Sequence, residues 1–327
     1  MKEKTFYIDT PPIHIGQLSE EDDFQINFDL KKDDFVGVLT IRLDPAHIEW
    51  DNHDEEYFPT ECNRLIVSVT TELDITEPIF IENIYFLVIE YLTIFFNYLQ
   101  TELGQYWVDV GSIQDWDLIT FLGKTIASHV EYDGLEKFGV PIGGYSKKKK
   151  ILFSAKRRIY PEKSNGLNVK HISDIRLWFE QRKEPALPRL LLANAKRSLL
   201  HGDRKSSSIL AITALEQPLE KFIKERCKAK GISKNTLETY DKNHFIADYL
   251  KLLLPLVLEP NELTEWLQSS NHRYKINISG NQIIEWAVEF NKARNDAVHR
   301  GITPIFETVD KGIFAIETIY EFVNEGN

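Results

Sequence analysis

The sequence predicts an α+β N-terminal domain, with mostly antiparallel strands around a core helix, followed by an all-α helical bundle. Two observations indicate this fold class, and a third, the division of charge, indicates two parts with different surfaces. The first 75 residues hold short runs of β-branched and aromatic residues, which favour strands. From Arg189 onward, apolar residues recur at helical spacing nearly to the end. The charge also divides, since residues 1–145 hold 8 Lys and Arg against 28 Asp and Glu, whereas residues 146–327 hold 31 against 22.

These patterns divide the chain into an acidic domain at 1–170, a linker at 171–188 and a helical domain at 189–327. The overall charge of −11 therefore hides a basic half, and residues 146–205 alone hold 17 Lys and Arg against 5 Asp and Glu. Such a division indicates two surfaces with different partners, so the overall charge does not exclude a nucleic acid.

The strands are expected to pair antiparallel through short connections. Thr10-Pro11-Pro12 and Lys31-Lys32-Asp33-Asp34 are typical of turns between them. The expected strands are Lys4–Asp9, Phe24–Leu30, Phe35–Leu43 and Arg64–Leu73.

Thr76-Glu77-Pro78 predicts a helix start, because proline is tolerated in the first turn. The helix that follows, from Ile79 to Leu103, is the most apolar segment and is long enough to cross a membrane. Polar residues interrupt it, among them Glu82 and Glu90, so we expect a core helix and no membrane partner.

Residues 104–170 predict short strands with a helical piece at Asp117–Lys124, a loop at 139–144 and a basic strand within Lys147–Tyr160. Breaks at Gly202-Asp203 and at 301–304 then separate the helices of the C-terminal half. Those helices are expected at 189–201, 204–230, 243–254, 261–269, 280–299 and 305–324.

Cys62 and Cys227 are far apart and belong to no C-x-x-C pair, which argues against a disulfide framework and a cysteine zinc site. The first residues, Met1 to Phe6, show no apolar signal region, so we expect a cytoplasmic protein.

The residues with the clearest chemistry close the expected helix 280–299. Asn295 and His299 are four residues apart and share a helix face, whereas Arg294 is offset from His299 by about 140°. Arginine carries a permanent positive charge and can donate two hydrogen bonds to one phosphate, and histidine exchanges a proton near neutral pH. Because one helix does not align the two side chains, a second helix or a second subunit is needed to bring them together.

This stretch, Arg294-Asn295-Asp296-Ala297-Val298-His299, resembles the R-x4–6-H motif of HEPN domains. The segment from Leu191 through Gly202-Asp203 to Leu215-Glu216 is similar to the turn and helix that open many of these domains. Pro218, soon after Glu216, departs from that pattern. The resemblance covers residues 186–325 and leaves the N-terminal half unexplained.

The resemblance implies a helical bundle that forms a homodimer or a higher homo-oligomer, with two R-x4-H motifs meeting across the interface. It also implies an endoribonuclease that needs no metal or cofactor and cuts RNA by attack of the 2′-hydroxyl, leaving a 2′,3′-cyclic phosphate. His299 would act as the general acid/base, Arg294 would stabilise the phosphate charge, and Asn295 would orient one of the two.

The same resemblance implies a phage-defence or toxin effector, with residues 1–170 as its sensor or regulatory domain. The expected partners are then RNA, with tRNA as one alternative, and a phage-derived trigger or an antitoxin. An acidic N-terminal domain could cover the basic half by mimicking the charge of RNA.

A non-catalytic alternative stands beside this interpretation. A histidine before a C-terminal glycine is favoured by the helix dipole, and Arg294 could pair with Glu289 or Asp296. The helical domain would then be a dimerisation module or a nucleotide- or RNA-binding interaction protein.

Two further clusters of residues in the sequence could bind a ligand. Basic residues with interleaved aromatics could track a phosphate backbone, or could simply keep a strand edge solvated. The candidate RNA-binding residues are Lys147, Lys148, Lys149, Lys150, Arg157 and Arg158, with Lys292 and Arg300 on the later helix. The second cluster is Asp44, His47, Glu49, Asp51 and His53. Positions 47, 49, 51 and 53 alternate as metal ligands on one face of a strand would, but the acidic neighbours favour a surface turn, and we predict no metal.

Overall fold

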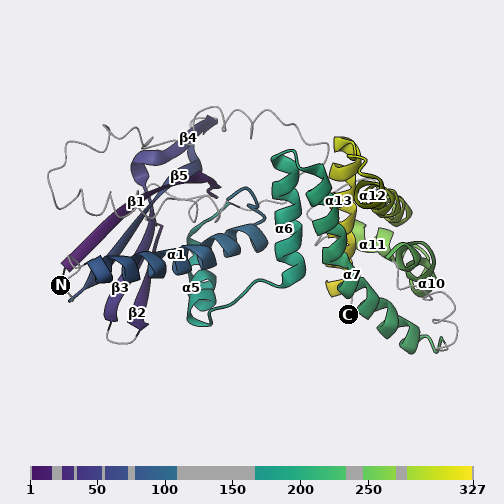
Figure 1. The fold of residues 1–327 in the computed structure, drawn as a ribbon, viewed down its shortest axis with the longest axis horizontal. Helices are drawn as coiled ribbons and strands as arrows, with labels where there is room; N and C mark the ends of the chain where they lie inside the picture. The colour runs from purple at the N-terminus through teal and green to yellow at the C-terminus, as the bar shows by residue number, and fades with distance from the viewer. Residues whose placement is uncertain are drawn as a thin grey trace. The chain divides into compact units, whose positions relative to one another are not determined.

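The computed structural model describes residues 2–16, 24–32, 35–53, 56–72, 78–108, 166–232, 246–269 and 278–325. The chain divides into two compact units with a boundary at Pro185/Ala186. The first contains an antiparallel sheet and the second is helical (Figure 1). The fold class expected from the sequence, antiparallel strands followed by helices, is confirmed at this level.

The sheet has the strand order β1-β5-β3-β2, with β4 also paired to β5. Its strands are β1 (Lys2–His14), β2 (Gln25–Lys32), β3 (Phe35–Leu43), β4 (Ile48–His53) and β5 (Glu56–Thr71). Strands β3 and β4 follow each other along one edge of β5, joined by the 3-10 turn η1 (Pro45–His47). Asp44 stabilises that turn, because its Oδ1 accepts the Ala46 N–H at 3.1 Å.

One sequence expectation for the sheet was wrong. The turn at Thr10-Pro11-Pro12 is absent from β1, which continues to His14 with a register irregularity between Asp9 and Ile13. An irregularity accommodates prolines, which cannot donate to the ladder. The strands on either side of the expected acidic turn pair with each other, since Asp51 of β4 pairs with Phe58 of β5 and His53 with Glu56, and Asp54 and Glu55 lie outside the described residues.

One face of the sheet is covered by α1 (Pro78–Thr101) and α5 (Ile172–Glu180). Phe28 of β2 stacks on Phe179 of α5 at 3.9 Å between ring centroids and lies 5.6 Å from Tyr91 of α1. Phe95 and Phe96 of α1 are fully buried, as expected for a core helix. Within the described residues, no helix is both long and apolar enough to cross a membrane.

The interval 171–188 is not a linker, because it contains α5 with the turn η3 (Val169–His171) before it. Trp178 of α5 packs edge-on against Tyr98 of α1 at 5.4 Å, and Arg182 pairs with Glu90 at 3.4 Å. A helix that buries aromatic side chains in the first unit belongs to it, so the boundary lies after the helix. The expected helix 117–124, the loop 139–144 and the strand within 147–160 lie outside the described residues.

The helical unit follows the sequence prediction closely. Its main helices are α6 (Leu187–Leu200), α7 (Arg204–Ala229), α12 (Gly280–Arg300) and α13 (Phe306–Glu325). Helix α7 packs against α6, α12 and α13, and its residues Leu215, Leu219 and Ile223 are fully buried. The expected helix 243–254 consists of α9 (Ile246–Asp248), the π-helical turn η4 (Tyr249–Leu253) and α10 (Leu254–Val257).

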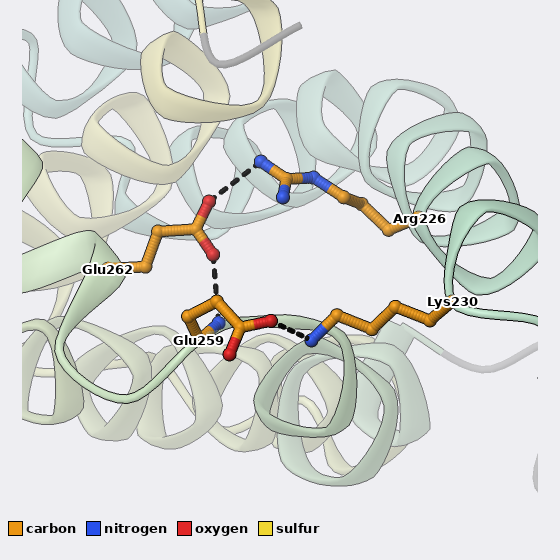
Figure 2. A network of polar contacts seen from close by, with 4 residues as sticks. All are labelled: Arg226, Lys230, Glu259 and Glu262. Atoms are coloured by element: carbon orange, nitrogen blue, oxygen red, sulfur yellow. Dashed lines mark hydrogen bonds and ion pairs between the residues drawn. The ribbon is translucent and has the colours of Figure 1, made fainter.

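A network of charges fastens the short helix α11 (Glu262–Gln268) to the end of α7 (Figure 2). Arg226 donates to Glu262 at 2.7 Å, and the other carboxylate oxygen of Glu262 accepts the Glu259 N–H at 2.9 Å. Lys230 pairs with Glu259 at 2.7 Å. The hydrogen bond and ion pair with Lys230 lower the pKa of the Glu259 carboxyl. One end of α7 is thereby tied to the chain that enters α11.

Candidate functional site

Helix α12 carries the candidate residues, and its boundaries are set by local chemistry. Ser279 caps its start, with a side-chain oxygen that accepts the Gln282 N–H at 3.3 Å. Gly280 is required there, because a Cβ would lie 2.8 Å from Leu263. The helix ends at Gly301, whose φ of +68° is in the left-handed region that favours glycine and whose N–H bonds the Asp296 carbonyl.

The buried face of α12 fixes its rotation in the unit. Ile283, Ala287 and Phe290 lie on that face at helical spacing and are fully buried. Phe290 approaches Gly312 of α13 so closely that a Cβ at position 312 would lie 2.1 Å from the Phe290 ring. The α12–α13 contact therefore depends on a glycine and sets the position of the last turns of α12.

Arg294 and Asn295 are joined in the structure. The Arg294 Nη1 donates to the Asn295 Oδ1 at 3.0 Å, and both residues are half-buried. The Arg294 Nε is buried and has no hydrogen-bond partner within the described ranges. Arg294 does not pair with Glu289 or Asp296, because Asp296 instead pairs with Arg300 at 3.2 Å. The Arg294 guanidinium is thus held by the Asn295 amide oxygen and not by a carboxylate of Glu289 or Asp296.

His299 is exposed in the last turn of α12. No hydrogen bond or ion pair joins its imidazole to another side chain of the described parts of the chain, whereas the cap at Gly301 is made by backbone groups. Five residues separate His299 from Arg294, about 7.5 Å along the helix. One copy of the chain therefore does not bring the two side chains together, as the sequence spacing predicts.

Asn291 is a polar residue of this helix that sequence reasoning missed. It lies one turn before Arg294 and Asn295 and is only 3% exposed. Its Oδ1 is buried without a hydrogen-bond partner among residues that the structure describes. Asn291 follows the buried Ala287 by four residues and the buried Ile283 by eight, so helical spacing was the signal in the sequence that could have placed it on the buried face. The buried Asn291 amide therefore lies about one helical turn before the half-buried Arg294 guanidinium.

The turn between α6 and α7 lies against the end of α12. Lys205, in the first turn of α7, donates from Nζ to the Gly301 carbonyl at 2.8 Å. Asp203 caps α7 by accepting the Ser206 N–H at 3.0 Å, and the bonds from Ser206 lower the pKa of its carboxyl. Glu216 lies further along α7, and no hydrogen bond joins it to Arg294 or His299.

Apolar side chains are exposed around the same end of the bundle. Val298, next to His299, is 47% exposed, and Ile302 and Ile305, which follow Gly301, are 53% and 64% exposed. Lys292 and Arg300 are also exposed on α12. The end of α12 thus combines an exposed imidazole, a half-buried guanidinium and uncovered aliphatic side chains.

The other candidate residues are either outside the described parts of the chain or in the first unit. Lys147, Lys148, Lys149, Lys150, Arg157 and Arg158 lie outside the described residues. The proposed alternation of metal ligands is interrupted, because His47 lies in the turn η1 while Glu49, Asp51 and His53 follow on β4. No group of three or more His, Cys, Asp and Glu side chains is placed to hold a metal in the described part of the chain. Cys62 and Cys227 are both buried free thiols, and burial raises the pKa of each.

Comparisons of the chain with family models, with curated proteins and with solved structures find no match.

Proposed function

We propose that the chain is an endoribonuclease of the HEPN type, in which Arg294, Asn295 and His299 act on a phosphodiester of RNA. The observation that carries this proposal is the end of α12, where the half-buried Arg294 is bonded to Asn295 and His299 is exposed five residues after Arg294. The resemblance of the motif supplies the reaction. The geometry supports it because the imidazole is accessible and the guanidinium keeps donors for an anion.

The proposed reaction transfers a phosphoryl group within the RNA. The 2′-hydroxyl oxygen bonds to phosphorus, its proton passes to a neutral imidazole of His299, and the bond from phosphorus to the 5′-oxygen breaks. A protonated imidazole donates a proton to that leaving oxygen. The products are a 2′,3′-cyclic phosphate and a free 5′-hydroxyl, so atoms and charge balance without a metal or a cofactor.

Arg294 has the role of stabilising the charge that builds on the non-bridging phosphate oxygens. Its planar guanidinium suits two oxygens of one phosphate, and a lysine would offer only a point charge. Asn295 accepts from Arg294 at 3.0 Å and so holds the plane of the guanidinium. The roles assigned to the three residues are those that the motif implies.

A homodimer is part of the proposal, because His299 and Arg294 diverge on one helix. A second copy would bring a second imidazole, so that one accepts a proton while the other donates. The exposed Val298, Ile302 and Ile305 beside His299 support an interface at this end of the bundle. A defence or toxin role, cytoplasmic location and control by the acidic N-terminal half belong to the same proposal and follow from the resemblance and the charge division.

The test is cleavage of total RNA in EDTA by the full chain and by variants. We expect His299→Ala and Arg294→Ala to lower the rate about 10²–10⁴-fold. Arg294→Lys should recover only part of it. Lys228→Ala is the control, since Lys228 is an exposed cation near the far end of α7. Equal cleavage by His299→Ala and the wild type would reject the site and leave the helix end as a non-catalytic interaction surface.

A further inference from the structure

The turn between α6 and α7 brings two neighbouring cations, Arg204 and Lys205, to the end of α12 that carries the candidate site. Between Glu184 and Glu216 the sequence has one acid, Asp203, against five Lys and Arg residues. The Asp203 carboxylate accepts the Ser206 N–H at the start of α7, where the helix dipole also favours a negative charge. Of these five cations, Lys196 pairs with Glu317 at 2.6 Å, and Arg204 and Lys205 directly follow the capping Asp203.

Lys205 places this turn beside the candidate site. Its Nζ donates to the carbonyl of Gly301 at 2.8 Å, two residues after His299 in sequence. A lysine ammonium has three donors, so this bond leaves two for another acceptor. Arg204 precedes Lys205 and is half-buried in the first turn of α7. We name Arg204 and Lys205 together the turn patch.

We infer that the turn patch binds the phosphate backbone of single-stranded RNA next to the phosphate that His299 serves. This inference rests on the proposed ribonuclease function, since that function makes RNA the ligand. Two cations at the edge of a site can hold the flanking phosphates, which positions the strand without reading its bases. The patch adds two residues that the sequence pattern alone did not single out.

The positive charge of this patch favours a nucleic-acid strand over a second protein as its ligand. A strand presents a regular row of phosphates that needs only cations, whereas a protein interface core is depleted in charged residues. The aliphatic surface formed by Val298, Ile302 and Ile305 is the part of this end that suits a second copy. The turn patch is therefore assigned to RNA and the aliphatic surface to the homodimer.

The experiment measures binding of the full chain to a fluorescent single-stranded oligouridine with 2′-O-methyl groups, which lacks the nucleophile and stays intact. The test variant is Arg204→Gln with Lys205→Gln. The control is Lys221→Gln with Lys228→Gln, which removes the same charge from exposed positions of α7. Lys221 lies 16 residues beyond Lys205, about 24 Å along the helix.

We expect the test variant to lose two phosphate contacts. The slope of log K against log salt then falls by about 1.4, and binding at 0.1 M salt weakens about 25-fold. The control should stay within about twofold of the wild type. Because Lys205 also bonds Gly301, Arg204→Gln is measured alone, and half of the change in slope is expected from it.

Other results would overturn the assignment. These are an unchanged slope in the test variant, an equal loss in the control, or no RNA binding by the wild type. A change in the mass of the oligomer in the test variant, with RNA affinity unchanged, would mean that a second copy covers the patch. The proposed ribonuclease function fails separately, if the wild type binds this RNA through the patch but does not cut unmodified RNA.

Discussion

The contact between Phe290 and Gly312 gives the sharpest prediction about stability. A Cβ at position 312 would lie 2.1 Å from the Phe290 Cγ, 2.4 Å from its Cδ2 and 2.6 Å from its Cβ. Ordinary contacts between carbon atoms are about 3.5–4.0 Å. The Phe290 ring is fully buried and cannot swing into solvent. We therefore expect Gly312→Ala to force α12 and α13 apart.

The size of the effect follows from two opposing contributions. Overpacking a filled core costs about 1–3 kcal/mol, and the severity of this overlap places the cost at the upper end. Replacing glycine by alanine inside a helix returns about 1 kcal/mol. The net expectation is a loss of about 2 kcal/mol in the free energy of unfolding, or about 4–8 °C in Tm.

Urea unfolding followed by circular dichroism would measure this loss, and a double-mutant cycle would assign it. In a Phe290→Ala background the ring atoms are gone, so adding Gly312→Ala should cost at least about 1 kcal/mol less than in the wild type. A neutral or stabilising Gly312→Ala would refute the reasoning. It would mean that the two helices are farther apart and that the last turns of α12 lie elsewhere.

Three further expectations concern stability in the helical unit. Arg226→Ala should cost about 1–2 kcal/mol by urea unfolding, and a cycle with Glu262→Ala should show positive coupling, since each change removes the opposite charge that lies 2.7 Å from the other partly buried side chain. Ser279→Ala should cost about 1 kcal/mol through loss of the cap of α12, whereas Ser279→Asp should cost little. The lowered pKa of Asp203 means that its carboxylate stabilises the fold above about pH 4 and loses that effect as the pH falls through the lower folded-state pKa. Between about pH 5 and 3 the wild type should therefore lose more stability than Asp203→Asn, and parallel pH profiles would contradict this cap.

Much of the fold could be predicted because local patterns coincide with tertiary packing. The helix α7 was expected at 204–230 and is observed at Arg204–Ala229, since its apolar residues face the bundle and an aspartate caps its start. The strand Phe35–Leu43 was predicted with its observed ends, because Leu39 and Ile41 alternate with residues that face the other way. Periodicity and caps act over short distances, so a sequence reveals them.

The features that the sequence did not predict correctly are those determined by tertiary contacts. Pro11 and Pro12 are typical of a turn, but β1 pairs with β5 both before and after them, so the strand continues to His14. The sequence predicts a linker where α5 lies, because the aromatic residues of α5 are buried only by packing against the sheet and α1. The contact of Lys205 with Gly301 joins residues 96 positions apart, and no spacing rule predicts it. The positions of Arg294, Asn295 and His299 on one helix were predicted, whereas the buried Asn291 beside them was not.

The chemistry of the RNA ends tests the central claim most directly. Total RNA incubated with the full chain in EDTA should give fragments with a 2′,3′-cyclic phosphate and a 5′-hydroxyl. His299→Ala should give none, and RNA with 2′-O-methyl groups throughout should stay intact. Fragments with a 5′-phosphate and a 3′-hydroxyl, or cleavage of the 2′-O-methyl RNA, would contradict attack by the 2′-hydroxyl at Arg294 and His299.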